Sequence, residues 1–157
     1  MILIKSDQEI EKMRQAGRKT AKVMEAITQM IGPGVTGLEL DRAAADVIHR
    51  EGSKPAFKGY MGYPSHICIS VNEVVVHGIP RDKPLKEGDI VGVDLGLVWD
   101  GYYGDMARTF SIGPVSKEAE KLVRVTEESL FQAIEKCTVE RRLGDISNAV
   151  ETWVSAQ

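Results

Sequence analysis

Two segments near the N-terminus carry apolar residues at the three-to-four spacing of an amphipathic helix. The first opens with the capping box Ser6-x-x-Glu9, and the second opens in the same way with Thr36-x-x-Glu39. Each segment ends at glycine, a common residue just past the end of a helix. The sequence therefore predicts two consecutive helices at the start of the chain.

The middle of the chain changes to β-branched runs. The runs "HICISV" and "VVVHGI" lie on either side of Asn72-Glu73 and predict two strands. After a polar loop, the stretch "GDIVGVDLGLVWDGYYGDMARTF" has Asp100-Gly101 between two apolar runs. An Asp-Gly pair in this setting is a strong signal for a two-residue hairpin turn, so two further strands are expected.

The hairpin turn also predicts a register. If Trp99 pairs with Tyr102, then Asp94 and Asp105 occupy diagonal positions on one face of the hairpin, with Cα atoms roughly 7–8 Å apart. Gly96 lies opposite Asp105 in this register. Together with Gly92 it flanks the first aspartate, so we expect both carboxylates to look onto space that no side chain fills.

An aspartate in the middle of a buried strand needs an explanation. Removing a carboxylate from water costs several kcal/mol unless a cation or hydrogen bonds compensate. One interpretation is that Asp94 and Asp105 hold a metal ion. The other is that Asp94 makes a structural hydrogen bond and Asp105 is a solvated loop acid, and the hairpin alone leaves both open.

The C-terminal part returns to a helical pattern. A long helix is predicted from Ser116, and "GDISNAVETWVSAQ" starts another. Helices, then an antiparallel sheet, then helices indicate the α+β class, with helices on one sheet face and the two aspartates on the other. Residues 1–157 are expected to form one domain.

Composition narrows the range of partners and locations. The chain has 43% hydrophobic and 27% charged residues and a net charge of −3, with acids and bases mixed along it. No basic stripe or long apolar segment is present, so nucleic acid and membrane are not expected as partners. The two cysteines are not spaced as a zinc or disulfide pair, which favours reduced thiols and the cytoplasm.

The stretch "VDLGLVWDGYYGDMARTF" resembles the D-x-G…G-Y-x-x-D-x-x-R-T-F motif of the pita-bread metallopeptidases. Upstream, "KPAFKGYMGYPSHICISVNEVVVHGIP" is similar to the segment that marks type I methionine aminopeptidases within this group. The resemblance implies half of a pita-bread fold and a hydrolase that removes the N-terminal methionine from new proteins. It also implies two divalent ions, such as Co, Mn, Fe or Zn.

The resemblance implies roles for three residues. Asp94 becomes a metal ligand, Asp105 a ligand that bridges two ions, and His77 the group that contacts the scissile peptide. The hairpin register agrees with the first two assignments. Without the resemblance, His77 would be interpreted as a structural histidine at the end of a strand.

The resemblance also points to a pocket for the methionine side chain, formed by Phe57, Tyr60, Tyr63 and Cys68. Aromatic rings and a soft sulfur would suit an unbranched thioether. Ordinary core packing would explain the same residues equally well. His66 receives no role from the resemblance.

The family pattern requires a further histidine and two glutamates as ligands, and the chain stops before the positions that would carry them. We therefore expect that one chain alone does not build a complete dinuclear site. Because the pita-bread fold has pseudo-twofold symmetry, a homodimer of two such halves is one hypothesis. In it the aspartates of both copies would hold Mn²⁺ or Mg²⁺ weakly.

A smaller departure from the family pattern lies between the last two predicted helices. Val139-Glu140 stands where family members usually have Pro-Gly. Loss of that turn signal predicts that the third helix runs on toward Leu143.

The sequence leaves two main interpretations of function. The first is a methionine aminopeptidase whose activity in this chain alone is small or absent. The alternative is a non-catalytic, self-associating half-domain or scaffold that binds metal weakly. A fragment of an X-prolyl peptidase would share the hairpin motif but not the segment that ends in "VVVHGIP".

Overall fold

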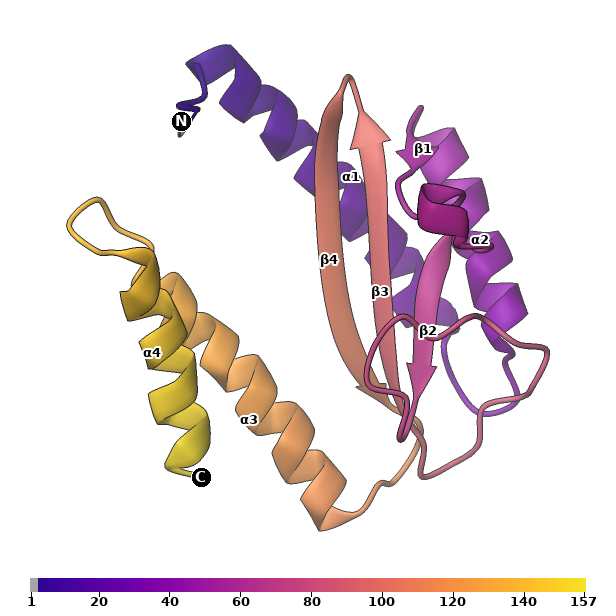
Figure 1. Cartoon of the computed structure of the whole chain (residues 1–157). Coiled ribbons are helices and arrows are strands. Elements are labelled where there is room, and N and C mark those ends of the chain that lie inside the picture. The colour runs from indigo at the N-terminus through magenta and orange to yellow at the C-terminus, as the bar shows by residue number, and fades with distance from the viewer. Residues whose placement is uncertain (1–2) are drawn as a thin grey trace. The chain divides into compact units, whose positions relative to one another are not determined.

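The computed structural model describes residues 3–157, which divide into two compact units at Pro114 and Val115. The first unit holds two helices and a four-stranded antiparallel sheet, and the second is a pair of helices (Figure 1). This arrangement confirms the α+β class. The expectation of a single domain over residues 1–157 stays a prediction.

The first unit begins with α1 (Asp7–Met30) and α2 (Gly37–Arg50), and both start as predicted. The Ser6 hydroxyl accepts a hydrogen bond from the Glu9 backbone N–H, and the Glu9 carboxylate accepts one from the Ser6 N–H. Thr36 and Glu39 make the same reciprocal pair at the start of α2. Two amide groups without helical partners are thus satisfied at each helix start.

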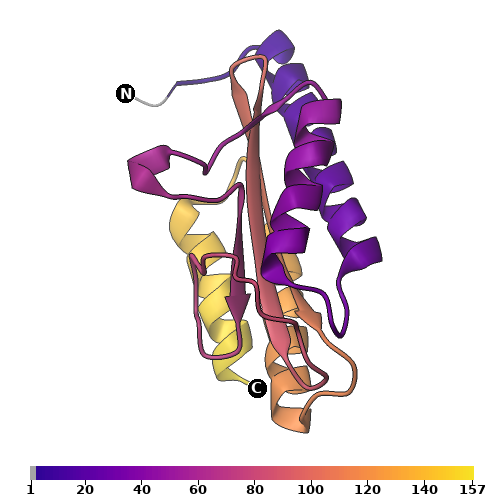
Figure 2. The ribbon, with the colours of Figure 1, turned by 90° about the vertical axis from the view of Figure 1, so that its right-hand side faces the viewer.

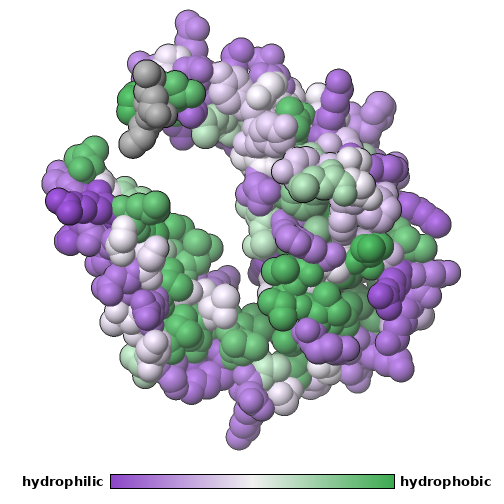
Figure 3. Space-filling model, viewed as in Figure 1, coloured by the Kyte–Doolittle hydropathy of each residue, from purple (hydrophilic) through white to green (hydrophobic). Residues whose placement is uncertain are grey.

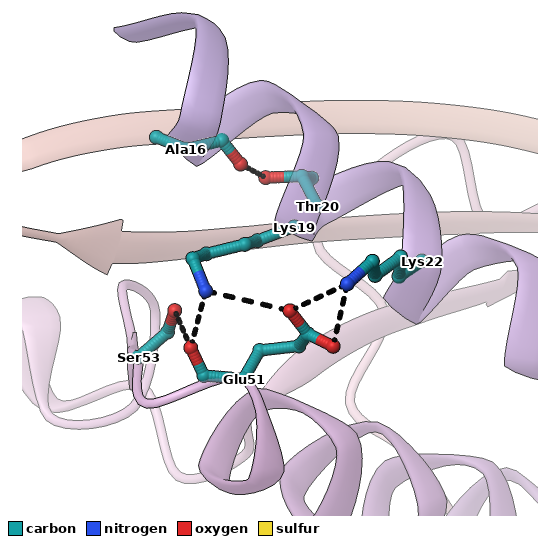
Figure 4. Close-up of polar contacts among 6 residues, drawn as sticks. All are labelled: Ala16, Lys19, Thr20, Lys22, Glu51 and Ser53. Carbon is teal, nitrogen blue, oxygen red and sulfur yellow. Dashed lines mark hydrogen bonds and ion pairs between the residues drawn. The ribbon is translucent and has the colours of Figure 1, made fainter. Parts of the chain in front are cut away.

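A polar clamp joins the end of α2 to the middle of α1 (Figure 4). Lys19 Nζ donates to the Glu51 carbonyl oxygen at 2.6 Å, and Lys22 Nζ lies 3.0 Å from both Glu51 carboxylate oxygens. These contacts lower the pKa of the Glu51 carboxyl, with Lys22 as the largest cause. Glu51 directly follows α2, so the clamp fixes how the two helices lie on the sheet.

The sheet consists of β1 (Lys54–Pro55), β2 (Ile67–Val71), β3 (Ile90–Trp99) and β4 (Tyr102–Ser111). Strand β3 is central: β1 and β2 pair with successive parts of one edge, and β4 pairs with the other. The hairpin register is the one predicted, with Trp99 opposite Tyr102. Asp100 and Gly101 both have positive φ, as a type I′ turn requires.

Helices α1 and α2 cover one face of this sheet (Figures 1 and 2). Four β3 side chains on that face are fully buried, namely Val91, Val93, Leu95 and Leu97, and Trp99 at the end of the strand is half-buried. On β4, a Cβ atom added to Gly104 would lie 2.6 Å from the Ala16 carbonyl oxygen of α1, so only glycine permits this close approach. The opposite face carries Asp94 and Asp105, as predicted.

The run "VVVHGI" does not form a strand, so that prediction was wrong. Asn72 and His77 both have positive φ, which an extended strand does not allow. Val75 is 87% exposed, so this stretch has no buried face that would favour pairing. The bonds that tie it to β2 include those from the Ile69 N–H to the Gly78 carbonyl and from the Gly78 N–H to the Ser70 hydroxyl. It is an exposed loop, which we call the His77 loop (residues 72–81).

The second unit consists of α3 (Lys117–Ile134) and α4 (Leu143–Ser155), which pack against each other. Helix α3 does not run on toward Leu143, contrary to the prediction. Turn hydrogen bonds from the N–H of Thr138 to Lys136 and of Arg141 to Thr138 reverse the chain instead. The chain therefore turns between α3 and α4 although Val139-Glu140 does not provide the Pro-Gly turn signal.

The helix pair exposes large apolar side chains among its charged ones. Figure 3 shows hydrophobic side chains along both helices of this unit. On α3 the exposed ones are Leu122, Leu130, Phe131 and Ile134. No helix within residues 3–157 has an apolar stretch long enough to cross a lipid bilayer.

Candidate active site

The candidate site is built on the sheet face opposite α1 and α2. Asp94 lies opposite Ala107 in the β3–β4 ladder, and Asp105 lies opposite Gly96. The two carboxylates therefore occupy the diagonal positions that the hairpin register predicted. Because the Asp100-Gly101 turn sets the register, local sequence alone places these two acids together.

Asp94 is half-buried, and its Oδ1 atom is buried without a hydrogen-bond partner among residues 3–157. Burial is the largest cause that raises the pKa of this carboxyl above its usual range, and the charge of Asp105 raises it further. The orphan oxygen excludes the interpretation in which protein hydrogen bonds satisfy Asp94 fully. An unpaired buried carboxylate oxygen costs free energy unless an outside group binds it.

His77 lies close enough to Asp94 for its charge to lower the pKa of that carboxyl, against the two stronger effects. Its ring is exposed, and its backbone has φ +56°, which a strand residue would not have. The His77 loop thus carries this imidazole on a turn in the chain rather than at a strand end, within electrostatic range of Asp94.

The space above Gly96 is not empty, which corrects one expectation. A Cβ atom at that position would lie 2.7 Å from the Phe57 ring and 3.2 Å from both Ala56 Cβ and Asp105 Oδ2. The absent side chain therefore makes room for an aromatic ring next to Asp105. At Gly92 the nearest atoms, both of Ser70, are at 3.7 Å, an ordinary contact distance.

Three of the four predicted pocket residues come together here. Cys68 is buried on β2 directly opposite Asp94, and burial raises the pKa of its thiol. Tyr63 interacts with Cys68 and with the charge of Asp94, and burial raises the pKa of its phenol. With Phe57 over Gly96, these side chains border the aspartates. Tyr60 is 71% exposed on the short helical turn η1 (Tyr60–Gly62).

The donor set fits part of a divalent-metal site. Two carboxylates, one with a buried free oxygen, are hard oxygen donors of the kind that Mg²⁺ and Mn²⁺ bind. Within residues 3–157 no group of three or more His, Cys, Asp or Glu side chains converges in a way that would hold an ion. The face therefore offers two ligands and no complete coordination sphere among the described residues.

Sequence reasoning missed a polar cluster beside the pocket. The buried Asp41 of α2 accepts hydrogen bonds from the backbone and the ring of His66, and the same ring contacts Lys58. A buried acid within the apolar stripe of α2 was the one available signal. His66 lies 25 residues further along the chain, so only the fold could identify it as the partner.

Comparison with known proteins identifies the protein family to which the chain belongs. The model of metallopeptidase family M24 matches residues 11–157, and the chain belongs to that family. This confirms the pita-bread resemblance. It also agrees with a sheet face that carries two carboxylates at diagonal positions.

Within the family, the chain is similar to methionine aminopeptidases. It is 47% identical to that of Clostridium perfringens and 48% identical to that of Clostridium acetobutylicum. In both cases the match covers 99% of this chain and 63% of the relative. The chain thus spans less than two thirds of the length of these relatives.

Solved structures give the same picture of the fold. The methionine aminopeptidase of Rickettsia prowazekii superposes with a TM-score of 0.96 at 38% identity, over 99% of this chain and 63% of that one. The prolidase of Pyrococcus furiosus superposes with a TM-score of 0.86 at 22% identity, over 98% of this chain and 44% of that one, which shows the fold alone. The chain therefore has the architecture of the matching part of the pita-bread fold.

Proposed function

We propose that the chain supplies part of the active site of a methionine aminopeptidase, which hydrolyses the peptide bond after an N-terminal methionine. The observation that carries the proposal is the orphan Oδ1 of Asp94, diagonal to Asp105, in a chain of a metallopeptidase family. The likeness to named methionine aminopeptidases supports this substrate. A cytoplasmic location is part of the same proposal.

Asp94 would ligate a divalent ion through its free oxygen, and Asp105 would bridge two ions. Such ions, when bound, supply a water of lowered pKa and polarise the scissile carbonyl group. Because the raised pKa of Asp94 comes from burial and from Asp105, a bound cation would favour its charged form. The candidate ions are Mn, Fe, Co and Zn.

His77 would act on the substrate itself. Its exposed ring near Asp94 can donate a hydrogen bond to the scissile peptide as the carbonyl carbon becomes tetrahedral. Phe57, Tyr63 and Cys68 would receive the methionine side chain beside the carboxylates, with Tyr60 at the exposed rim. A flexible thioether packs well against aromatic edges and a thiol.

The proposal is tested by release of methionine from a Met-Gly peptide, with added Mn²⁺ or Co²⁺, by the wild type and by Asp105→Ala. We expect wild-type release to be small, since residues 3–157 offer only two of the metal ligands. Asp105→Ala should abolish it, and Asp82→Ala, on the loop before β3, is a matched control. Release that survives Asp105→Ala would overturn the metal role of that residue.

A second candidate function is a self-associating module, a homodimer that pairs two copies as pseudo-symmetric halves. The observation that favours it is that each unit exposes large apolar side chains, such as Val75 of the His77 loop in the first unit and Phe131 of α3 in the second. Light scattering with a concentration series tests it directly. A monomer at all concentrations would eliminate the homodimer.

A further inference from the structure

The segment that carries the candidate pocket aromatics needs anchors. We call residues 56–66 the pocket segment, because Phe57, Tyr60 and Tyr63 lie on it. Two glycines and Met61 at its centre have positive φ, and Met61, at φ +47°, is 91% exposed. A strained and exposed turn of this kind stays in place only if its surroundings determine it.

The two ends of the pocket segment are tied to the sheet. At the first end, the Ala56 N–H donates to the Gly96 carbonyl at 2.9 Å. Near the other, the Tyr63 hydroxyl lies 2.9 Å from the Gly78 carbonyl oxygen and 3.1 Å from that of Ile67. These bonds fix the ends, and the turn between them is closed by its own backbone bonds, such as that from the Gly59 N–H to the Tyr63 carbonyl oxygen at 2.8 Å.

Asp41 of α2 provides a third anchor from the helix layer. It is only 8% exposed, and its two carboxylate oxygens have different partners. Oδ1 accepts from the backbone N–H groups of His66 at 2.7 Å and Ile67 at 3.0 Å. Oδ2 lies 2.8 Å from His66 Nδ1. One oxygen therefore holds the backbone, and the other holds the ring.

The contact of the second ring nitrogen, Nε2, indicates which nitrogen of His66 carries the proton. Nε2 lies 3.1 Å from Lys58 Nζ, and an ammonium group can only donate. Nε2 must then be the acceptor, so the ring proton is on Nδ1, where the Asp41 carboxylate accepts it.

We propose that Asp41, His66 and Lys58 form a positioning relay that holds the pocket segment in the shape required for the methionine side chain. Lys58 follows Phe57 directly, so fixing its ammonium restrains the turn from inside the segment. The role in substrate binding rests on the proposed function. The arrangement of the three side chains does not depend on the proposed function.

Asp41→Asn separates the ring contact from the backbone contact. The amide oxygen of asparagine can still accept from the N–H groups of residues 66 and 67. Its NH₂ group, however, meets His66 Nδ1 as a donor, so the ring proton must move to Nε2 and face Lys58. Asp46→Asn on the exposed side of α2 is the matched control.

The first test is ¹⁵N NMR of the histidine rings at neutral pH. We expect wild-type His66 to be protonated at Nδ1 alone, Asp41→Asn to shift the proton to Nε2, and Asp46→Asn to change nothing. The exposed His49 ring serves as an internal reference in the same spectrum. A wild-type His66 protonated at Nε2 alone, or at both nitrogens, would overturn the relay.

The second test measures the pocket segment and its ligand separately. Lys58→Met, which keeps the aliphatic stem, should shift the backbone amide signals of residues 57–63 and weaken methioninamide binding about tenfold, the effect of one lost charge-assisted hydrogen bond. Lys58→Arg should restore both. Unchanged amide signals in Lys58→Met would overturn the relay. If the wild type does not bind methioninamide but the amide signals shift as expected, the proposed function fails and the relay stands.

Discussion

The two faces of the central strand β3 differ in residue type and in how well their buried atoms are satisfied. On the face toward α1 and α2, four consecutive inward positions are aliphatic and fully buried. On the other face, the alternate positions are Gly92, Asp94 and Gly96, and the aspartate keeps a buried oxygen without a partner. One face therefore stabilises the fold by apolar burial, and the other reduces that stability because it carries a buried carboxylate oxygen without a partner among residues 3–157.

The same contrast extends to the loops beside the sheet. The pocket segment lies over the aspartate-bearing face, with Phe57 against Gly96, and it contains strained backbone. The α1–α2 side has regular caps and the Glu51 clamp instead (Figure 4). Strain and unpaired polar atoms are typical of binding sites, while satisfied caps and close packing are typical of a scaffold.

The largest expected effect is on the covered face. Leu95→Ala removes a fully buried side chain under α1 and α2 and should lower the free energy of unfolding by about 2–5 kcal/mol. Leu122→Ala, at a 59% exposed position of α3, is the size-matched control and should cost far less. Urea denaturation followed by circular dichroism measures both. Equal losses for the two variants would contradict the assignment of the core.

A smaller effect is expected at the start of α2, which covers that face. Thr36→Ala removes the hydroxyl that accepts from the Glu39 N–H and should cost about 1 kcal/mol. Thr36→Ser keeps the hydroxyl and should recover most of the loss. The same denaturation experiment decides, and a Thr36→Ser variant as unstable as Thr36→Ala would show that the capping bond is not responsible.

The smallest effect, and one of opposite sign, is expected on the aspartate-bearing face. Burial and Asp105 raise the pKa of Asp94 in the folded chain, so the folded state binds its proton more tightly than the unfolded state. This contribution stabilises the fold at acid pH and is lost as the pH rises through the folded pKa. Asp94→Asn should therefore be more stable than the metal-free wild type at neutral pH.

The gain from Asp94→Asn should disappear at acid pH, below both pKa values of the wild-type carboxyl. Thermal unfolding in the presence of a chelator, at neutral and at acid pH, measures the difference. Asp89→Asn is the contrasting variant, because hydrogen bonds with Asn72 and with the Lys86 N–H lower the pKa of that carboxyl. It should be less stable than the wild type at neutral pH. Destabilisation by Asp94→Asn at neutral pH would contradict the claim that the buried Asp94 carboxylate lowers the stability of the metal-free fold.

The sequence predicts the helix caps and the hairpin well because both are local. Ser6 with Glu9, and Asp100 with Gly101, act within four residues, and the turn then dictates the register that brings the aspartates together. Short-range signals are therefore enough to locate the two acids of the site. Their roles as metal ligands rest on the family resemblance and stay predictions.

Most of the structural features that the sequence did not predict correctly depend on contacts beyond the local segment. The valines of the His77 loop have strand propensity, but strand formation depends on a buried face and an available partner, and Val75 has neither a buried side chain nor a ladder partner. The Phe57 ring over Gly96 likewise depends on packing between distant segments, whereas the end of α3 depends on turn hydrogen bonds that carry no Pro-Gly signal in the sequence. Asp41 with His66 is the clearest case, since 25 residues separate them.

The most direct test of the central claim is Mn²⁺ binding followed by the loss of the free-ion signal in electron paramagnetic resonance. The account predicts that the wild type binds Mn²⁺ weakly, that Asp94→Asn and Asp105→Asn each abolish binding, and that Asp82→Asn retains it. Wild-type affinity in both Asp94→Asn and Asp105→Asn would contradict the claim that this sheet face binds a divalent metal.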